Sequence, residues 1–239
     1  SDAQRTNPNR TLVGRPFDTP FGYKTLGLFT TADDKNGDGI INGEDGYNVQ
    51  QFGQLHPGDI KYADLSGPDG VPDGRIDAHD LTQIGYPVYP LWTFGLTPSM
   101  RYKGIDLTLF LQGSANSSID VYQFMTVPFE NNGSNTAYEY MDNRWTPNNQ
   151  NAKYPRATPS PYANNTQDSD FWMVNTSYLR LKTFSLGYSL PSRFSNSIRM
   201  QNIRLYVLGQ NLLTFSKLKH IDPEMGYDDR ETAYPVMKA

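Results

Sequence analysis

Residues 93–113 read TFGLTPSMRYKGIDLTLFLQG, and the alternation of their side chains decides the fold class. One face of the first half is apolar, with Phe94, Leu96, Met100 and Tyr102. One face of the second half is apolar as well, with Ile105, Leu107, Leu109 and Leu111, while the other face carries Asp106, Thr108 and Gln112. Lys103 and Gly104 between the halves form a two-residue turn, because glycine accepts a positive φ. The stretch predicts a long β-hairpin with one apolar face.

A second hairpin is predicted by YLRLKTFSLGYSLPSRFSNSIRMQNIRLYVLGQNLLTF at residues 178–215. Its first strand alternates apolar with small residues, although Arg180 and Lys182 introduce charge near its start. The partner strand, residues 203–212, is apolar on both faces, so the pattern does not say which face is covered.

Strands of this length predict an all-β chain, and two architectures fit the alternation. A transmembrane barrel has lipid outside and water inside, whereas a soluble sandwich buries its apolar faces in a core. The connection at Lys103 and Gly104 is minimal and that at 191–202 is moderate, but the connection at 114–177 is long and rich in Asn. Short turns on one side and long loops on the other favour the barrel.

Composition excludes several functional classes. The 239 residues carry a formal charge of -4, and the carboxylates gather in two Asp-rich stretches, so no nucleic-acid partner is expected. The absence of cysteine excludes disulfides and Cys-zinc sites in this chain. No apolar run reaches the roughly 18 residues of a membrane-spanning helix.

The first Asp-rich stretch, DKNGDGIINGED at residues 34–45, fits a calcium-loop template, with Gly39 at the sharp turn. Oxygen donors fill the ligand positions: Asp34, Asn36, Asp38, the Ile40 carbonyl, Asn42 and Asp45. Calcium prefers such a set of oxygen ligands. The alternative is that the Asn-Gly and Asp-Gly pairs mark polar turns.

The second stretch, DLSGPDGVPDGRIDAHD at residues 64–80, is a poorer copy. Its weaker predicted metal ligands are Asp69, Asp73, Asp77 and Asp80. Counting from Asp69 places Val71, which has no side-chain oxygen, at the second ligand position. In an alternative frame Asp64 and Ser66 begin the loop and GPDGVP is an insertion.

Aromatic side chains are frequent in the long connection. They are Tyr122, Phe124, Tyr138, Tyr140, Trp145, Tyr154, Phe171 and Trp172. Tyr138, Tyr140, Trp145 and Trp172 are candidates for binding a substrate, but packing of the loop against itself explains them as well. His56, His79 and His220 are isolated, and no catalytic motif surrounds them, so no enzyme is predicted.

Six segments together resemble the C-terminal barrel portion of the SusC/RagA family of TonB-linked outer-membrane transporters. The segments occur in the family's order and span nearly the whole chain. They are GYKTLGLF from Gly22, GDIKYADL from Gly58, the first hairpin with IGYPVYPL before it, RWTPNNQNAKYPR from Arg144, SDFWMVNTSYLRLKTFSLGYSLP from Ser169, and RLYVLGQNLLTF from Arg204 with IDPE after it.

The resemblance implies import of oligosaccharides or peptides across a Gram-negative outer membrane. In that family a barrel of about 22 strands holds a plug, a SusD-like surface lipoprotein forms a lid, and the TonB complex supplies energy. Residues 1–239 then form one barrel segment without plug, TonB box or last strand, and we expect a longer polypeptide. Residues 31–85 form an extracellular Asp-rich loop region, where calcium plays a structural part. Pro98 requires a local bulge, because every strand N–H in a barrel needs a partner.

Two functions of other classes stay open. A secreted calcium-dependent β-rich glycan-binding module also combines strands with Asp loops. A carbohydrate-active enzyme needs a carboxylate pair across a cleft, whereas these Asp residues suit metal ligation better.

Overall fold

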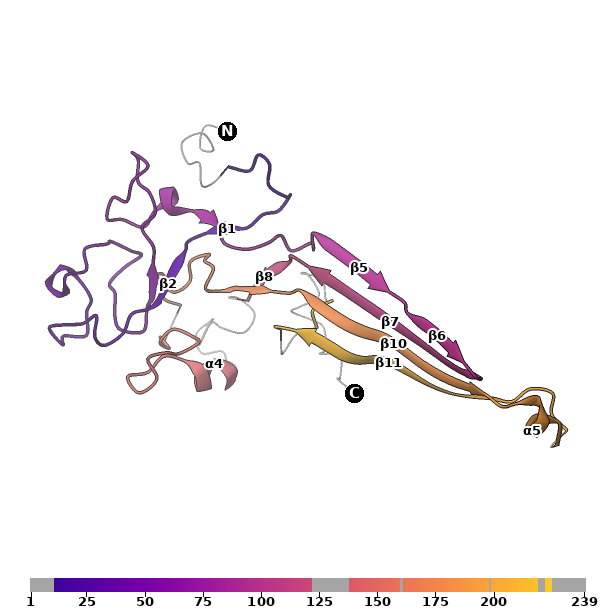
Figure 1. The fold of residues 1–239 in the computed structure, drawn as a ribbon. Helices are drawn as coiled ribbons and strands as arrows, with labels where there is room; N and C mark the ends of the chain where they lie inside the picture. The colour runs from indigo at the N-terminus through magenta and orange to yellow at the C-terminus, as the bar shows by residue number, and fades with distance from the viewer. Residues whose placement is uncertain (1–10, 122–137, 160, 198, 219–221, 225–239) are drawn as a thin grey trace. The chain divides into compact units, whose positions relative to one another are not determined.

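The computed structural model describes residues 11–121, 138–159, 161–197, 199–218 and 222–224 (Figure 1). The chain divides into two compact units. Unit 1 comprises Ser1–Pro87 and Ile119–Val174, and unit 2 comprises Val88–Ser118 and Asn175–Ala239. Tyr122, Phe124, His220 and the chain end after Glu224 lie outside the described residues.

Unit 2 contains an antiparallel five-stranded sheet. Its strands are β5 (Trp92–Leu96), β6 (Ser99–Tyr102), β7 (Ile105–Ala115), β10 (Tyr178–Ser189) and β11 (Arg204–Ser216). The order is β11-β10-β7-β5, and β6 also pairs with β7, as Figure 1 shows. The short helix α5 (Ser192–Ser197) lies between β10 and β11 in sequence. The predicted all-β antiparallel architecture is confirmed.

The predicted hairpin turn forms where the sequence places it. Lys103 has a φ of 48° and Gly104 a φ of 86°, the pair of positive angles that a type I′ turn requires. Tyr102 pairs directly with Ile105 across the turn. The Ser189 N–H donates to the Gly104 carbonyl at 2.8 Å, so the end of β10 lies beside this turn.

The prediction of a bulge at Pro98 is wrong. Leu96 pairs with Leu111 and Ser99 with Thr108, so both strands advance by the same number of residues past the proline. The Pro98 carbonyl accepts a hydrogen bond from the Leu109 N–H at 3.0 Å, so proline removes a single donor from the ladder. The register shifts instead in β10, between Leu181 and Thr183.

The register settles the face of β11 that its sequence leaves open. Residues directly opposite each other in an antiparallel pair share a face. Tyr206 lies opposite Gly187 and Leu208 opposite Ser185, so both belong to the polar face. Leu205 and Val207 therefore lie on the apolar face.

The apolar face of the sheet stays uncovered in the described structure. Its members include Trp92, Leu96, Met100, Leu205 and Phe215, which are 61–67% exposed. The polar face carries Thr93, Ser99, Asp106, Thr108, Gln112, Ser114, Arg180 and Ser185, which the register aligns across the strands. The sheet thus has one face suited to an apolar environment and one suited to water.

Unit 1 consists of short elements joined by long loops. Two-stranded sheets pair β1 (Phe21–Gly22) with β4 (Thr82–Gln83), β2 (Thr25–Leu28) with β3 (Ile60–Tyr62), and β8 (Ser118–Asp120) with β9 (Met173–Asn175). Its helical turns are η2 (Gly43–Asp45), η3 (Ala78–Asp80) and α4 (Tyr138–Asn143). In the part of the chain that is described, no helix has the length and apolar character needed to cross a membrane.

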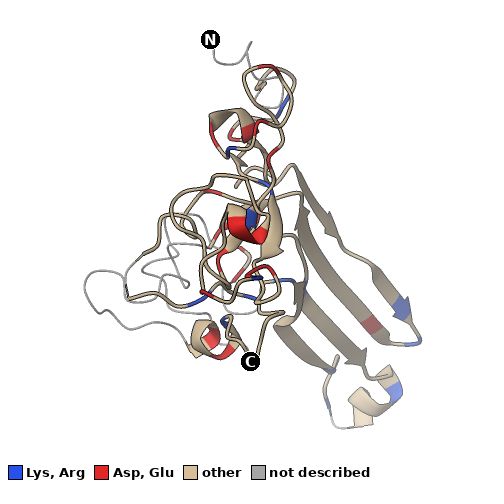
Figure 2. Cartoon of the chain, turned by 90° about the vertical axis from the view of Figure 1, so that its left-hand side faces the viewer, with Lys and Arg blue, Asp and Glu red and all other residues tan. Residues whose placement is uncertain are grey.

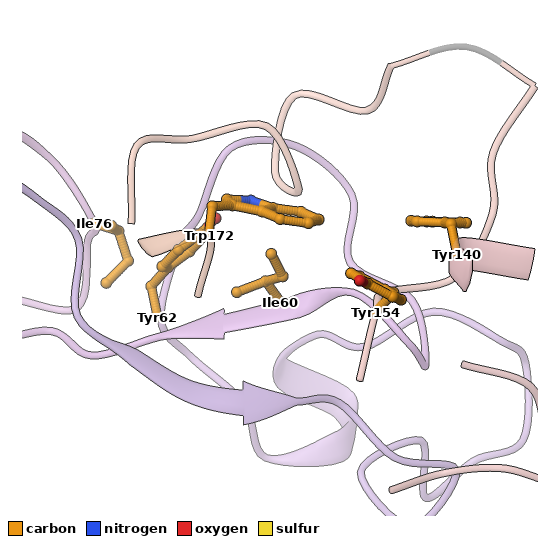
Figure 3. Packing of buried hydrophobic residues seen from close by; sticks show 6 residues of the cluster. All are labelled: Ile60, Tyr62, Ile76, Tyr140, Tyr154 and Trp172. Atoms are coloured by element: carbon orange, nitrogen blue, oxygen red, sulfur yellow. The ribbon is translucent and has the colours of Figure 1, made fainter. Parts of the chain in front are cut away.

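An aromatic core holds the loops of unit 1 together. Ile60, Tyr62 and Ile76 belong to the first segment of unit 1, Ser1–Pro87. They pack against Tyr140, Tyr154 and Trp172 of its second segment, Ile119–Val174 (Figure 3). The rings of Tyr140 and Tyr154 stack with centroids 5.2 Å apart. A smaller cluster consists of Phe29, Ile41 and Leu55. The loops of unit 1 are therefore held by a core of their own, because two segments distant in sequence bury their apolar side chains together.

Candidate functional site

The first Asp-rich loop is organised by its own carboxylates. Asp34 accepts hydrogen bonds from the N–H groups of Gly37 and Gly39, each at 2.9 Å. Asp38 accepts one from the Ile40 N–H at 2.7 Å. These bonds wind the backbone around the side-chain oxygens, as the short carboxylates and the glycines of the sequence allow.

Asp45 closes this loop from a buried position. Its carboxylate accepts hydrogen bonds from the N–H groups of Lys35 at 2.8 Å, Asn36 at 3.2 Å and Asn42 at 3.0 Å. Burial acts to raise the pKa of Asp45, but the three N–H donors and the Lys35 ammonium outweigh it and lower that pKa. Asp45 is therefore held as a carboxylate at neutral pH.

The second loop repeats this pattern with Asp64 in the first position. Asp64 accepts from the Gly74 N–H at 2.6 Å, as Asp34 does from Gly39. Asp80 accepts from the N–H groups of Leu65 at 2.6 Å and Ser66 at 3.0 Å. Both loops end in a capping box, formed by Asn42 and Asp45 in the first and by Asp77 and Asp80 in the second.

These hydrogen bonds favour the frame that begins at Asp64 over the one that begins at Asp69. Asp73 keeps its position, because it accepts from the Arg75 N–H at 3.0 Å as Asp38 does from Ile40. Asp69 instead lies in a tight turn, where the Gly70 N–H donates to the Gly67 carbonyl at 2.9 Å. The residues GPDGVP, 67–72, are the insertion that the alternative frame required.

The two loops are joined through one backbone position. The Gln50 N–H donates to the Gly74 carbonyl, and the Ile76 N–H donates to the Gln50 carbonyl, both at 2.8 Å. His56 contacts the first loop as well, since its Nδ1 lies 2.6 Å from the Gly39 carbonyl oxygen. Among the described residues, no three His, Asp or Glu side chains converge closely enough to hold a metal ion by themselves. A cation in either loop would therefore need the amide and carbonyl oxygens of the motif as well.

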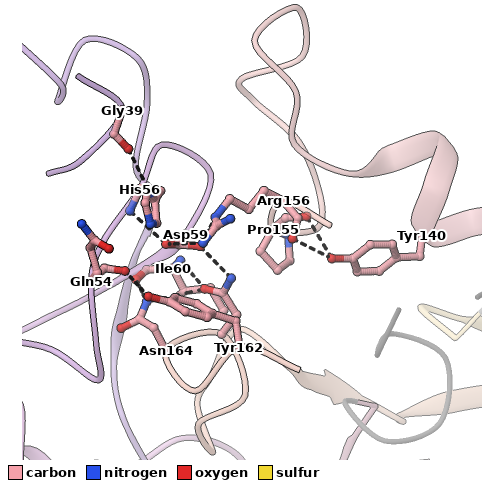
Figure 4. Close-up of polar contacts among 11 residues, drawn as sticks. Gly39, Gln54, His56, Asp59, Ile60, Tyr140, Pro155, Arg156, Tyr162 and Asn164 are labelled. Carbon is pink, nitrogen blue, oxygen red and sulfur yellow. Dashed lines mark hydrogen bonds and ion pairs between the residues drawn. The ribbon is translucent and has the colours of Figure 1, made fainter. Parts of the chain in front are cut away.

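A buried polar network connects the second segment of unit 1, Ile119–Val174, with the first segment, Ser1–Pro87 (Figure 4). Asp59 is fully buried and accepts hydrogen bonds from Arg156 Nε at 2.6 Å and Asn165 Nδ2 at 2.9 Å. The His56 N–H donates to the same carboxylate at 2.9 Å. Asn164 and Tyr62 add bonds to backbone carbonyls nearby. Sequence reasoning missed this network, because Asp59 and Arg156 stand in no recognisable spacing.

Three of the four aromatic candidates for substrate binding are part of the core. Tyr140 is 1% exposed, Trp145 8% and Trp172 2%. Trp145 lies against Gly58, where an added Cβ would approach its ring to 2.6 Å. None of these three offers an open ring face to a ligand, so the packing explanation holds for them. Tyr138 is 88% exposed and is the one of the four that a ligand can reach in this structure.

The polar face of the sheet carries an ionic cluster. Arg180 donates to Asp222 at 2.7 Å and to Glu224 at 2.5 Å, and Lys182 binds Glu224 at 2.6 Å. Burial acts to raise the pKa of Asp222, but the hydrogen bond and the positive charge of Arg180 outweigh it and lower the pKa. Asp222 and Glu224 therefore lie beside the start of β10.

A second ion pair lies near the hairpin turn. Arg204 contacts Asp106 at 2.5 Å on the same polar face. Figure 2 colours few other positions on the strands as charged residues, whereas acidic positions recur in the loops of unit 1. The apolar face is thus free of the charges that the sheet contains.

Comparison with known proteins supplies relatives for nearly the whole chain. No protein-family model matches the sequence. TonB-dependent receptor P3 of Formosa agariphila is 32% identical over 207 residues, which is 87% of this chain and 18% of that protein. SusC of Bacteroides thetaiotaomicron, a TonB-dependent receptor, is 29% identical over 168 residues, or 68% of this chain and 16% of SusC. The chain spans about a fifth of the length of the curated relatives that it matches.

The fold agrees with this relationship. The solved structure of the RagAB peptide transporter superimposes on 86% of this chain with a TM-score of 0.51 at 21% identity, over 20% of the RagAB chain. At that identity the likeness concerns the fold alone, and it matches an antiparallel sheet with one apolar face to part of a barrel. On the sequence relatives and the shared fold together, the chain belongs to the SusC/RagA family of TonB-dependent outer-membrane receptors.

Proposed function

We propose that the protein containing this chain imports oligosaccharides or peptides across the outer membrane. The observation that carries the proposal is the sheet of unit 2, whose apolar face is exposed while its other face is polar. Within lipid, such a sheet satisfies its backbone only as part of a closed barrel. A barrel wall with a polar interior provides a path for hydrophilic nutrients. No catalytic role is assigned to this chain.

The partners follow from the family. A SusD-like surface lipoprotein would cover the outer mouth, and the TonB complex would supply energy through parts of the longer polypeptide. Residues 31–85 precede β5 in the chain, and β5 begins at the end opposite the Lys103–Gly104 turn. If that short turn faces the periplasm, unit 1 with residues 31–85 belongs to the extracellular side, where a lid and a substrate arrive.

We also propose that the two Asp-rich loops bind calcium. Support comes from the wound backbone, the buried Asp45 and Asp80, and the same hydrogen-bond pattern in both loops. In the first loop the ligands would be Asp34, Asn36, Asp38, the Ile40 carbonyl, Asn42 and Asp45. In the second they would be Asp64, Asp73, Asp77 and Asp80, with Ser66 in place of Asn36. The ion would neutralise these carboxylates and stiffen the loops.

The secreted glycan-binding module is the weaker alternative. A soluble sandwich would bury the apolar face of its sheet, whereas Trp92 and Leu205 are 67% and 65% exposed here. Extraction behaviour separates the two: the full-length protein should leave the membrane fraction only with detergent.

Deletion of the full-length gene in its host tests the import proposal. We expect loss of uptake of the nutrient, whether a labelled oligosaccharide or a peptide, and restoration by the gene in trans. Collapse of the proton-motive force should abolish uptake as well, because TonB-coupled import needs it. Uptake that continues unchanged in the deletion strain for every oligosaccharide and peptide tested would contradict the proposal.

A further inference from the structure

An apolar groove of about 620 Å³ lies on the sheet of unit 2, at the strand ends next to the Lys103–Gly104 turn. Gly187 and Tyr206 pair directly and belong to the polar face, so their backbones form the floor of the groove. The side chains that line it from the apolar face are 40–65% exposed and are those of Ile105, Leu186, Tyr188, Leu205 and Val207. The volume lies within the range of roughly 300–1,000 Å³ that ligand sites occupy.

Two tyrosines lie at the turn end of this groove. Tyr188 pairs directly with Ile105 and with Leu205. Tyr102 pairs with Ile105 from the other side, so both tyrosines share the apolar face. The turn lies against the first of them, because a Cβ added at Gly104 would be 3.5 Å from Cε2 of Tyr188. Tyrosine is enriched at the level of the lipid headgroups, so this row places the groove just inside the hydrocarbon layer and the turn just outside it.

The chain beyond the groove is basic. Residues 97–105 and 187–209 contain no carboxylate and five cations, namely Arg101, Lys103, Arg193, Arg199 and Arg204. Arg204 is paired with Asp106 on the polar face. Lys103, Arg193 and Arg199 are exposed, and none of them forms an ion pair with another described residue. This end of the sheet therefore carries positive charge that the described structure does not neutralise.

The connection between β10 and β11, residues 191–202, begins directly beyond the groove. The Leu190 N–H donates to the Ile203 carbonyl at 2.9 Å and closes the base of the connection. The helix α5 lies in it, at the end of the sheet (Figure 1). Phe194 and Met200 are 62% and 55% exposed, and each is next in sequence to one of the exposed arginines. Apolar and cationic side chains thus stand together, as in segments that lie in the headgroup layer of a membrane.

We propose that this end of the sheet binds one anionic phospholipid, with an acyl chain in the groove and the phosphate at Lys103, Arg193 and Arg199. An apolar groove followed by a cluster of cations requires a ligand that is apolar at one end and anionic at the other, which describes such a lipid. A zwitterionic lipid would bring a cation of its own to the cluster, and a second copy of this chain would bring the same cations again. The inference rests on the barrel placement proposed above and concerns the lipid around the barrel rather than its cargo.

Lipid binding to the full-length protein in detergent tests the site, with native mass spectrometry as the measurement. The probes are palmitoyl-oleoyl phosphatidylglycerol, palmitoyl-oleoyl phosphatidylcholine, which has the same chains and no net charge, and glycerophosphoglycerol, which is the anionic headgroup without chains. We expect phosphatidylglycerol to bind more than about tenfold more tightly than phosphatidylcholine, because each cation near an anionic headgroup contributes about a fivefold gain. The headgroup without chains should give no detectable complex.

Matched variants separate the two parts of the site. Arg193→Gln/Arg199→Gln should weaken binding of phosphatidylglycerol by about an order of magnitude and leave that of phosphatidylcholine unchanged. Val207→Trp fills the groove with an apolar side chain and should weaken binding of both phospholipids alike. Lys217→Gln is the control, because it removes an exposed cation just after the opposite end of β11. Its affinity for phosphatidylglycerol should stay within about twofold of the wild type.

The outcomes separate this inference from the import function. Equal affinity of the wild type for the two phospholipids, or of the double arginine variant and the wild type for phosphatidylglycerol, would overturn the site while leaving import intact. Binding of the headgroup as tight as that of the whole lipid would overturn it as well, since the groove would then play no part. A dimer that Val207→Trp abolishes would assign the groove to a second copy. Release of the full-length protein from the membrane fraction without detergent would overturn both the site and the barrel placement.

Discussion

Replacing Asp59 by alanine should open unit 1 without disturbing the sheet of unit 2. Asp59 is fully buried, and its carboxylate connects residues 54–60 with the second segment of unit 1, Ile119–Val174. Its removal leaves the Arg156 guanidinium without its carboxylate and leaves Asn165 Nδ2 and the His56 N–H without an acceptor. The loss is therefore that of an ion pair together with two further hydrogen bonds.

The magnitude follows from the burial of the two partners. Breaking a buried ion pair by removing one member costs about 3–5 kcal/mol, because the other charge remains without compensation. The Arg156 side chain is 24% exposed and retains some water, so the lower end, about 3 kcal/mol, applies. Local opening should then become more than a hundredfold more frequent.

Hydrogen exchange of the full-length protein measures this opening directly. Amides in residues 54–62 and 162–172 should exchange faster by about that factor in Asp59→Ala, while those of β7 keep their wild-type rates. Lys153→Ala is the matched control, since it removes an ion pair to Glu139 at 2.8 Å whose lysine is 59% exposed. That pair should be worth less than about 1 kcal/mol. Exchange in Asp59→Ala within threefold of the wild type would refute the argument.

Three further predictions concern the strand faces and the Asp-rich loops. Leu109→Arg should impair barrel assembly far more than Thr108→Arg, because an arginine on the lipid face costs about 2–4 kcal/mol near the midplane; outer-membrane levels of folded protein measure this, and equal tolerance would contradict it. Asp64→Ala should lower the calcium stoichiometry in a titration of the full-length protein, whereas Asp69→Ala should not; equal effects would restore the frame that begins at Asp69. Hydrogen bonds lower the pKa of Asp45. The stabilisation of the folded loop by its carboxylate is therefore complete above the ordinary carboxyl pKa of about 3.9, and it is lost as the pH falls through the lowered pKa. Protease sensitivity of residues 34–46 should therefore stay constant from about pH 7 to pH 5 and rise below about pH 4.

The hairpin at 93–113 was predictable because its information is local. Alternation at period two sets the faces of β7, and glycine at position 104 sets the turn. The orientation of β11 was not predictable from the sequence, because residues 205–208 are all apolar. Only the pairing with β10 shows which of them lie on the apolar face. The bulge predicted at Pro98 did not form, because the loss of one N–H donor does not require a bulge.

The loops of unit 1 were predictable only in part. The first follows its template closely, so its Asp and Asn positions could be assigned from spacing alone. In the second loop, residues 67–72 occupy the place that Gly37 alone occupies in the first loop. The hydrogen-bond pattern was therefore needed to assign Asp64 to the first position of the loop. The aromatic core and the Asp59 network join residues about a hundred positions apart, and a single sequence carries no signal for such contacts.

The central claim is that β7 forms part of a barrel wall with lipid on one side and water on the other. The chain contains no cysteine, so single cysteines introduced along β7 can carry spin labels at unique positions within it. Labels at Leu107 and Leu109 should collide mainly with oxygen dissolved in lipid, and labels at Thr108 and Gln112 mainly with a water-soluble nickel chelate, alternating residue by residue in the full-length protein in bilayers. Uniform accessibility along the strand, or preference for the nickel chelate at Leu107 and Leu109, would contradict the account.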